Sequence, residues 1–305
     1  MQEFSGQQRV VDCMPELKDL IQLMWVRYAA REGEGTYRYA KLSANILREV
    51  SSYYFSEVSQ LFVGYDQDQI QVFNAVGGHY KTWKRPESLS NDHLICMISK
   101  VSALCLGGYP ASKTVYRLNL LKTEVTEAPS MLSIREDPGL IQYERMVYVF
   151  GGFDGQVYLN SCEVFSLSRR QWMPLPDMLK PGCHFPPAIL DADIYLPNYQ
   201  FVQGFHIPSQ TFRLILLRPY LTSRPLLLAF EGELIFITQE LQVGRFRPSD
   251  ANEVELQRGK VKSDYPFFAI PISVPVLYDR VAMWVTRNDM KFAKLDLDNW
   301  TISTS

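Results

Sequence analysis

The chain has 305 residues, of which 47% are hydrophobic and 21% charged, so it can bury a sizeable core and is too apolar for a disordered chain. A formal net charge of −2 and a pI of about 6.1 provide no basic field of the kind that attracts nucleic acid or an anionic membrane. Five cysteines at scattered positions fit reduced core thiols better than a disulfide framework or a Cys-x-x-Cys metal site.

The N-terminal stretch MQEFSGQQRVVDC contains Glu3 and has no apolar core, so it does not resemble a secretory signal. The uncharged stretch 265–278 is interrupted by three prolines and is too short to span a bilayer. We therefore expect a protein that is not secreted, has no membrane span, and resides in the cytoplasm or on the cytoskeleton.

Residues 1–51 are predicted to form a helical hairpin. Six apolar residues lie on one face of a first helix: Leu17, Leu20, Ile21, Met24, Trp25 and Tyr28. Gly33 and Gly35 end this helix, and a second one is expected over residues 37–48.

The apolar stripe of this hairpin has two interpretations. It packs on the domain that follows, or it contacts a helix of another protein. Residues 14–17, MPEL, superficially resemble the opening of an F-box, but the residues after Trp25 do not continue that pattern.

Six copies of one sequence unit follow, each with an apolar run that ends at a comparable position. The runs end at Gly64, Gly108, Gly152, Asn198, Thr238 and Thr286, at intervals of 40 to 48 residues. Two residues earlier every copy has a large apolar side chain: Phe62, Leu106, Phe150, Leu196, Phe236 and Trp284. The position before that is apolar in every copy as well. Repeats of this length built from short strands are typical of a β-propeller.

Within each copy the apolar run is interpreted as the second of four strands. In the third copy a shorter strand, residues 140–143, precedes it, with Glu144-Arg145 as a tight turn. The third strands are marked by Phe73, Tyr116, Phe165, Phe205, Phe246 and either Phe292 or Leu295. The fourth strands are marked best by Trp172, Phe212 and Trp300. The predicted units cover residues 52–91, 92–131, 132–178, 179–223, 224–263 and 264–305.

The third copy resembles the kelch family. It has Gly151-Gly152, an aromatic and aliphatic third strand, Trp172, and then a turn over residues 174–178. The resemblance covers roughly residues 52–305 and implies a mainly β fold: a six-bladed kelch-type β-propeller behind the N-terminal α-helical hairpin. Only the second and third copies keep both glycines, and Asn74, Arg117, Ser166, His206 and Arg247 stand where the family has an aspartate.

Two positions of the repeat have specific expectations. Trp172 is predicted to fill the space between adjacent blades, so that removing its ring costs about 3 to 5 kcal/mol of stability. The glycines after the second strand are expected to adopt a positive φ and allow close approach of the backbone. Asn198 replaces the glycine in the fourth copy.

The sequence contains no constellation of catalytic residues. The four histidines fall singly in different units, and no phosphate-binding loop, Gly-x-Ser-x-Gly or His-Glu-x-x-His motif is present. Galactose oxidase, a kelch-type copper enzyme, has a tyrosine, cysteine and histidine set with no match here. We therefore expect no enzyme activity, no cofactor and no metal.

The loops between second and third strands, and those joining one blade to the next, emerge on the same side of a propeller, where members of this family commonly bind partners. Aromatic residues and arginines are frequent anchors of interfaces. The candidate partner-binding residues are Tyr65, Asp66, Tyr109, Lys113, Phe153, Asp154, Tyr158, Tyr199, Arg135, Arg224 and Arg287. Alternatively, the aromatic residues after the glycines pack under their own loops.

These observations favour a non-enzymatic protein–protein interaction scaffold, a structural subunit of a larger cytoskeletal or organellar assembly, whose partners bind the hairpin and the loops. One alternative is a substrate-recognition adaptor of a ubiquitin ligase, which calls for a BTB or F-box module that we do not expect in this sequence. Another is a propeller enzyme that acts on a small molecule.

Overall fold

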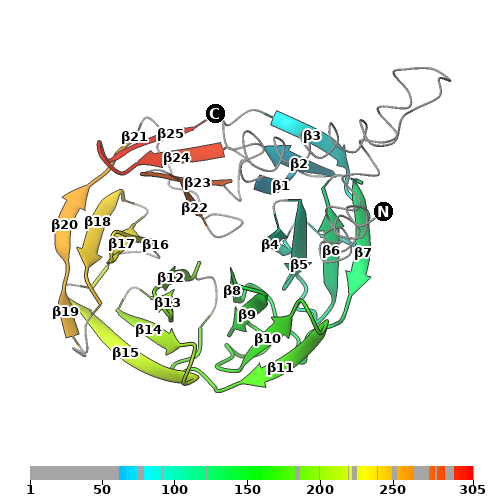
Figure 1. Ribbon diagram of the computed structural model, residues 1–305, viewed down its shortest axis with the longest axis horizontal. Helices are drawn as coiled ribbons and strands as arrows, with labels where there is room; N and C mark the ends of the chain where they lie inside the picture. Colours follow the sequence, from blue (N-terminus) through cyan, green and yellow to red (C-terminus); the bar gives the residue numbers. More distant parts are fainter. Residues whose placement is uncertain are drawn as a thin grey trace, which may run out of the picture. The chain divides into compact units, whose positions relative to one another are not determined.

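The computed structural model describes residues 62–66, 68–73, 79–90, 92–99, 101–120, 122–182, 186–198, 200–218, 220–221, 225–238, 240–248, 253–263, 275–278, 280–285 and 292–304. The chain separates into two units, Met1–Leu61 and Phe62–Ser305. The predicted helical hairpin and the predicted first strand of the first blade, residues 52–55, lie outside the described residues. The strands of the second unit form six separate sheets arranged in a ring around a common axis (Figure 1).

The first three sheets are numbered as blades in chain order. Blade 1 contains β1 (Phe62–Asp66), β2 (Gln69–Phe73) and β3 (His79–Lys84). Blade 2 contains β4 (Leu94–Ser99), β5 (Ser102–Leu106), β6 (Val115–Asn119) and β7 (Glu124–Ala128). Blade 3 contains β8 (Gly139–Tyr143), β9 (Met146–Phe150), β10 (Cys162–Ser166) and β11 (Gln171–Leu175). All pairings within these blades are antiparallel.

The other three blades share a segment at their outer edges. Blade 4 contains β12 (Ala188–Leu190), β13 (Asp193–Pro197), β14 (Phe201–His206), β15 (Thr211–Arg218) and, at its edge, β19 (Glu253–Glu255). Blade 5 contains β16 (Leu226–Phe230), β17 (Glu233–Ile237), β18 (Gln242–Phe246) and β20 (Gln257–Lys260). Blade 6 contains β22 (Val276–Tyr278), β23 (Val281–Val285), β24 (Phe292–Asp296), β25 (Thr301–Thr304) and, at its edge, β21 (Lys262–Ser263).

Tight turns of the same geometry recur around the ring. First and second strands are joined by two-residue turns in which a non-glycine residue has positive φ: Glu144, Asp191, Glu231 and Arg280 in blades 3 to 6. In the turns between third and fourth strands, the last residue also has a positive φ: Thr123, Arg170, Gln210 and Trp300 in blades 2, 3, 4 and 6. Backbones with this twist connect antiparallel strands without splaying them. The blades are therefore set by local turns as well as by packing.

The turns correct three details of the predicted alignment. In blades 4 to 6 the repeat alignment is shifted by one residue from the predicted one, since Ile194, Leu234 and Ala282 pair with the third strand as Val147 does. In blade 6 the third-strand marker is Leu295, which pairs with Ile302. Trp300 is a turn residue with φ +52° and does not mark the fourth strand.

The predicted positive φ is confirmed for both glycines of blade 3 and for one glycine of blade 2, whereas Gly108, the predicted end of the second run, does not have a positive φ. Gly107, Gly151 and Gly152 have φ of +68°, +57° and +103°. Gly64 lies inside β1, paired with Gln71, and so does not end the strand. Asn198 is not among the described residues with positive φ; its side-chain Oδ1 instead accepts a hydrogen bond from the Gln200 N–H at 3.3 Å.

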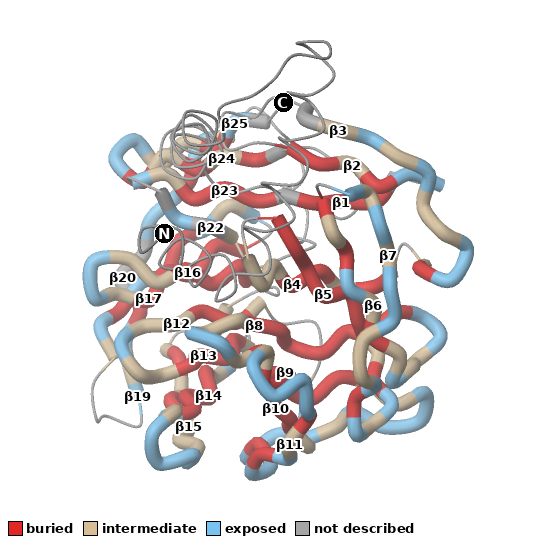
Figure 2. Tube along the Cα trace, turned by 45° about the vertical axis from the view of Figure 1, so that its right-hand side comes forward, coloured by how far each residue is buried: buried red, intermediate tan, exposed pale blue. Residues whose placement is uncertain are grey.

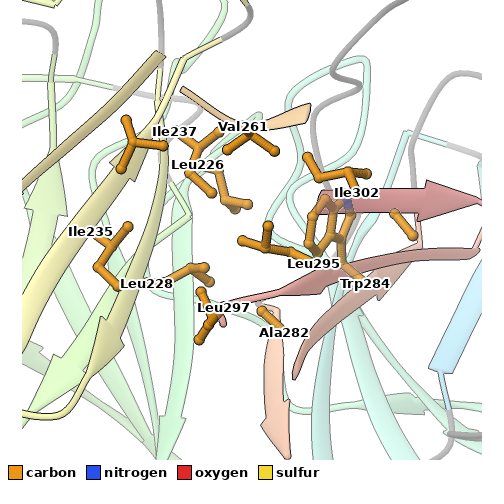
Figure 3. Packing of buried hydrophobic residues seen from close by; sticks show 12 residues of the cluster. Leu226, Leu228, Ile235, Ile237, Val261, Ala282, Trp284, Leu295, Leu297 and Ile302 are labelled. Atoms are coloured by element: carbon orange, nitrogen blue, oxygen red, sulfur yellow. The ribbon is translucent and has the colours of Figure 1, made fainter. Parts of the chain in front are cut away.

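The apolar core is divided into clusters between neighbouring blades. Figure 2 shows the inner strands β5 and β9 as buried and the outer strand β7 as largely exposed. Trp172 is 6% exposed in the cluster between blades 2 and 3, as predicted, and its Nε1 donates to the Pro129 carbonyl at 2.7 Å. Between blades 5 and 6, Trp284 packs with aliphatic side chains of both sheets (Figure 3). Each blade is therefore stabilised through its neighbours.

Candidate functional site

The two sides of the ring are built from different connections. Because strand direction alternates within a blade, second-to-third strand loops and blade-to-blade connectors emerge on one side, here called the loop face. The connections between first and second strands, and those between third and fourth strands, emerge on the other side, here called the turn face. On the loop face of blades 2 and 3 the relevant segments are residues 107–114, 129–138, 151–161 and 176–182.

The connector from blade 2 to blade 3 lies between the loops of both blades. On one side Ser112 and Arg135 exchange backbone hydrogen bonds of 3.2 and 3.1 Å, and the Asp137 N–H donates to the Gly107 carbonyl at 2.9 Å. On the other side Glu136 and Phe153 exchange bonds of 2.7 and 2.9 Å. Three segments distant in sequence thus form one hydrogen-bonded layer.

A buried ion pair supports this layer from below. Arg135 and Glu163 are each 1% exposed, and Arg135 Nε donates to Glu163 Oε1 at 2.8 Å. The same guanidinium donates to the Gly151 and Ser161 carbonyls at 2.6 and 2.8 Å. Glu163 also accepts the backbone N–H of Leu132 at 2.6 Å. Because every partner is hydrogen-bonded, the pair can tolerate burial and holds the connector against blade 3.

The loop of blade 3 is shaped by its two glycines and by one carboxylate. A side chain on Gly151 would come within 2.3 Å of the Gly182 carbonyl, so only glycine allows the next connector to approach. At the loop tip Asp154 Oδ1 accepts the N–H groups of Gln156 and Val157, both at 2.8 Å. These hydrogen bonds hold the pKa of Asp154 below its ordinary value of 3.8.

Exposed apolar side chains gather on this supported layer. Tyr109, Leu132, Ile134, Val157 and Tyr158 are each 49 to 66% exposed, and we call them the blade 2–3 loop surface. The described part of the chain has eight large exposed hydrophobic side chains. Seven lie in connections of the loop face: these five together with Leu179 and Tyr220. The eighth, Leu277, lies in β22. Large apolar side chains that gather on one exposed surface are typical of protein interaction sites.

The structure places part of the predicted site on this surface. Tyr109, Lys113 and Tyr158 are exposed there. Phe153 is half-buried, with its ring 5.3 Å from that of Tyr158, and Asp154 caps its own loop. The alternative that the aromatic residues pack under their loops therefore describes Phe153, whereas Tyr109 and Tyr158 remain accessible.

Two predicted contact residues lie in the interior, which corrects the prediction. Tyr65 is 4% exposed within β1, and its hydroxyl donates to Cys105 Sγ at 3.0 Å. Burial raises the pKa of the Tyr65 hydroxyl well above its ordinary value. Arg135 is the buried partner of Glu163 described above. Asp66 is the last residue of β1, paired with Gln69, and so belongs to a strand rather than to a loop. Tyr199, Arg224 and Arg287 lie outside the described residues.

The sequence interpretation missed Leu132, Ile134 and Val157, which are apolar residues in otherwise polar loops. It also missed Glu163, a charged residue within the fully buried strand β10. A charged residue within an apolar strand predicts a buried ion pair, because a buried carboxylate needs a cation or several N–H groups as partners.

The described cysteines lie in the interior of the propeller. Cys96, Cys105 and Cys162 are free and buried, as expected of core thiols, and burial raises the pKa of each to about 12. No group of three or more His, Cys, Asp or Glu side chains suited to a metal ion occurs among the described residues. Among the same residues, no helix has the length and apolar character needed to cross a membrane.

The comparisons with known proteins agree with this architecture. The Kelch motif matches residues 136–179, the blade with the double glycine and Trp172. Over 96 residues the chain is 27% identical to "Kelch repeat and BTB domain-containing protein 2" of Ectromelia virus (strain Moscow). That alignment covers 32% of this chain and spans only 17% of the viral protein's length.

The six sheets form a six-bladed β-propeller, and its third blade carries a Kelch motif. Kelch propellers typically bind proteins.

Proposed function

We propose that this chain is a non-enzymatic protein-binding scaffold that engages its partner through the blade 2–3 loop surface. The observation that carries the proposal is the concentration of exposed apolar side chains on one face, above a hydrogen-bonded layer. Aromatic and aliphatic anchors of this kind contribute most when they are held rigidly before binding, because less conformational entropy is then lost.

The supporting layer makes this surface suitable as a platform. The backbone of residues 131–138 is bonded on both sides, and the Arg135–Glu163 pair fixes it from below. The exposed side chains Leu132 and Ile134 shortly precede this buried arginine in sequence. A partner with complementary apolar side chains therefore finds the surface preformed.

Site-specific photo-cross-linking tests the proposal. A photoreactive phenylalanine analogue replaces Tyr158 or, as a matched control on the turn face, Ser209, which is also exposed. In cell extract we expect a discrete protein adduct from position 158 that is lost when Tyr109→Ser and Val157→Ser are added. Adducts from position 209 alone, or equal adducts from both positions, would contradict the assignment.

We further propose that the chain is a structural subunit of a larger assembly in the cytoplasm, cytoskeletal or organellar. The combination of protein-binding loops with a net charge of −2 supports a protein rather than a nucleic-acid partner. Size-exclusion chromatography of native extract should place the chain in a stable complex well above its own 35.2 kDa. Elution as a free monomer would argue against this role.

A substrate-recognition adaptor of a ubiquitin ligase is the second candidate, favoured by the match to a viral protein whose name includes a BTB domain. The two roles differ in what happens to the cross-linked partner. Depletion of this chain should lengthen the partner's half-life if the chain is an adaptor, and should leave it unchanged or shorten it if the chain is a structural scaffold.

A further inference from the structure

The outer edges of the blades are protected in different ways. An exposed edge strand can pair with another chain, and proteins prevent this with charged residues, proline or a covering segment. β3 carries Lys81 and Lys84, β7 carries Glu124 and Glu127, and β11 carries Pro174. β15, the outer strand of blade 4, instead contains the uninterrupted aliphatic run of residues 214–217, LILL.

A segment of blade 5 covers part of this aliphatic edge. Residues 247–256 join the third and fourth strands of blade 5, where blades 3, 4 and 6 use four-residue turns. β19, within this connection, runs parallel to β15 and pairs with Leu216, Leu217 and Arg218. Figure 1 shows β19 beside β15 at the rim of the ring. We call residues 253–256 the strap.

The strap is attached to blade 4 by a few contacts. The Leu256 N–H donates to the Arg218 carbonyl at 2.8 Å, and Arg218 Nε donates to Glu253 Oε1 at 2.8 Å. The two side chains of this ion pair are 44 and 53% exposed, so water screens it. Leu256 is 6% exposed in the cluster between blades 4 and 5, with Val254 packed against that cluster. The strap is therefore anchored at Leu256 and weakly held before it.

The strap resembles an extended peptide that binds by adding a strand to the edge of a sheet. Glu253 and Glu255 flank Val254, and one carboxylate meets the arginine that ends β15. Backbone pairing supplies affinity in strand addition, while side chains that alternate along the strand supply selectivity. We propose that the outer edge of β15 is a strand-addition site that the strap fills within the chain, and that it accepts from a partner an extended segment of acidic–aliphatic–acidic pattern. This site is separate from the loop surface.

A proline substitution and its matched control test the site in the full chain. The Leu256 N–H points to β15, and N–H groups two residues apart in a strand point the same way, so Val254→Pro removes a donor to β15. Glu255→Pro affects an N–H on the opposite side, which tolerates proline. Hydrogen exchange of the fragment 214–218 should accelerate roughly tenfold or more in Val254→Pro, and little in Glu255→Pro.

The probe is a fluorescent peptide of residues 251–257, ANEVELQ, followed by anisotropy. We expect it to bind Val254→Pro about tenfold or more tightly than the wild type, and a peptide with both glutamates changed to lysine to bind about tenfold less tightly than the native peptide. Equal binding of both peptides, no binding despite accelerated exchange, unchanged exchange, or dimerisation that the peptide does not reverse would each overturn the proposal. If circular dichroism shows that Val254→Pro is unfolded, the double variant Glu253→Ala/Glu255→Ala takes its place, and smaller changes in the same directions are expected because it removes only a screened ion pair.

Discussion

The loop face and the turn face of this propeller connect the same strands, but their connections are stabilised in different ways. Turns such as 144–145 and 167–170 are two or four residues long and stabilised by local backbone geometry. The loops of blades 2 and 3 are longer, stabilised by the buried Arg135–Glu163 pair, and expose apolar side chains. The Arg135–Glu163 ion pair is buried beneath the exposed apolar side chains of the loop face, whereas Arg280 on the turn face forms ion pairs that are exposed to water. A loop that must remain rigid while presenting Tyr109 and Tyr158 to a partner needs support from within.

The largest expected difference between the faces concerns their arginines. Arg135→Ala leaves Glu163 buried without its cation, and we expect a loss of about 3 to 5 kcal/mol of unfolding free energy. On the turn face, Arg280 contacts Glu231 and Asp298 but is 44% exposed, so water screens these ion pairs and Arg280→Ala should cost clearly less than Arg135→Ala. Urea denaturation followed by tryptophan fluorescence measures both. Equal losses would show that burial does not distinguish the two faces.

Substituting a glycine should also cost more stability on the loop face than on the turn face, but the difference should be smaller than for the arginines. Gly232 on the turn face has φ +78° and open space where a side chain would lie, so Gly232→Ala should cost about 1 to 2 kcal/mol for the left-handed backbone alone. Gly151 adds the 2.3 Å approach to the Gly182 carbonyl, so Gly151→Ala should cost clearly more. Thermal melts of the two variants are the measurement. A milder effect at Gly151 would mean that the connector moves aside freely.

A pH effect is expected from the buried His93, which packs beside Gly108 at the start of a blade 2 loop. Burial lowers the pKa of His93 from its ordinary value of 6.5, so the unfolded chain binds more protons in the window below that value. The folded state therefore loses stability as the pH falls through 6.5 towards the lowered pKa. The melting temperature of His93→Gln should fall less than that of the wild type over this window. Parallel curves for the two proteins would contradict this explanation.

The smallest effect on stability is expected at the exposed residues of the loop face. Tyr109 is 66% exposed, so Tyr109→Ser should change the unfolding free energy by no more than about 0.5 kcal/mol. The same substitution should weaken formation of the partner adduct at position 158. Circular dichroism melts and cross-linking yields together separate a binding role from a structural one. A destabilised Tyr109→Ser would place this residue with the framework of the loop.

Much of the ring was readable from sequence because each blade repeats a local pattern. The apolar second strands, the interblade position of Trp172 and the positive φ of Gly107, Gly151 and Gly152 were predicted correctly, whereas Gly108 does not have a positive φ. The errors arose where a side chain was judged by its place in a loop. Tyr65 and Arg135 had the residue types of interface anchors, yet neighbouring strands bury both. Trp300 was assigned to a strand on its aromatic character, although the turn geometry makes Ile302 the paired residue.

The strap was not predictable in the same manner. Residues 253–255 pair in parallel with a strand of another blade that lies 37 residues earlier in the sequence. The local repeat of apolar residues does not predict a pairing over such a distance. The only local sign was that residues 247–256 exceed the usual turn length between third and fourth strands.

The sequence by itself determined the number of blades and the order of their strands, because hairpins form between neighbouring segments whose turns and apolar periods are encoded locally. The tertiary structure decided which loop residues are accessible, where Arg135 finds its carboxylate and which edge the strap covers. These features depend on contacts between blades, and such contacts exist only once neighbouring blades have packed together.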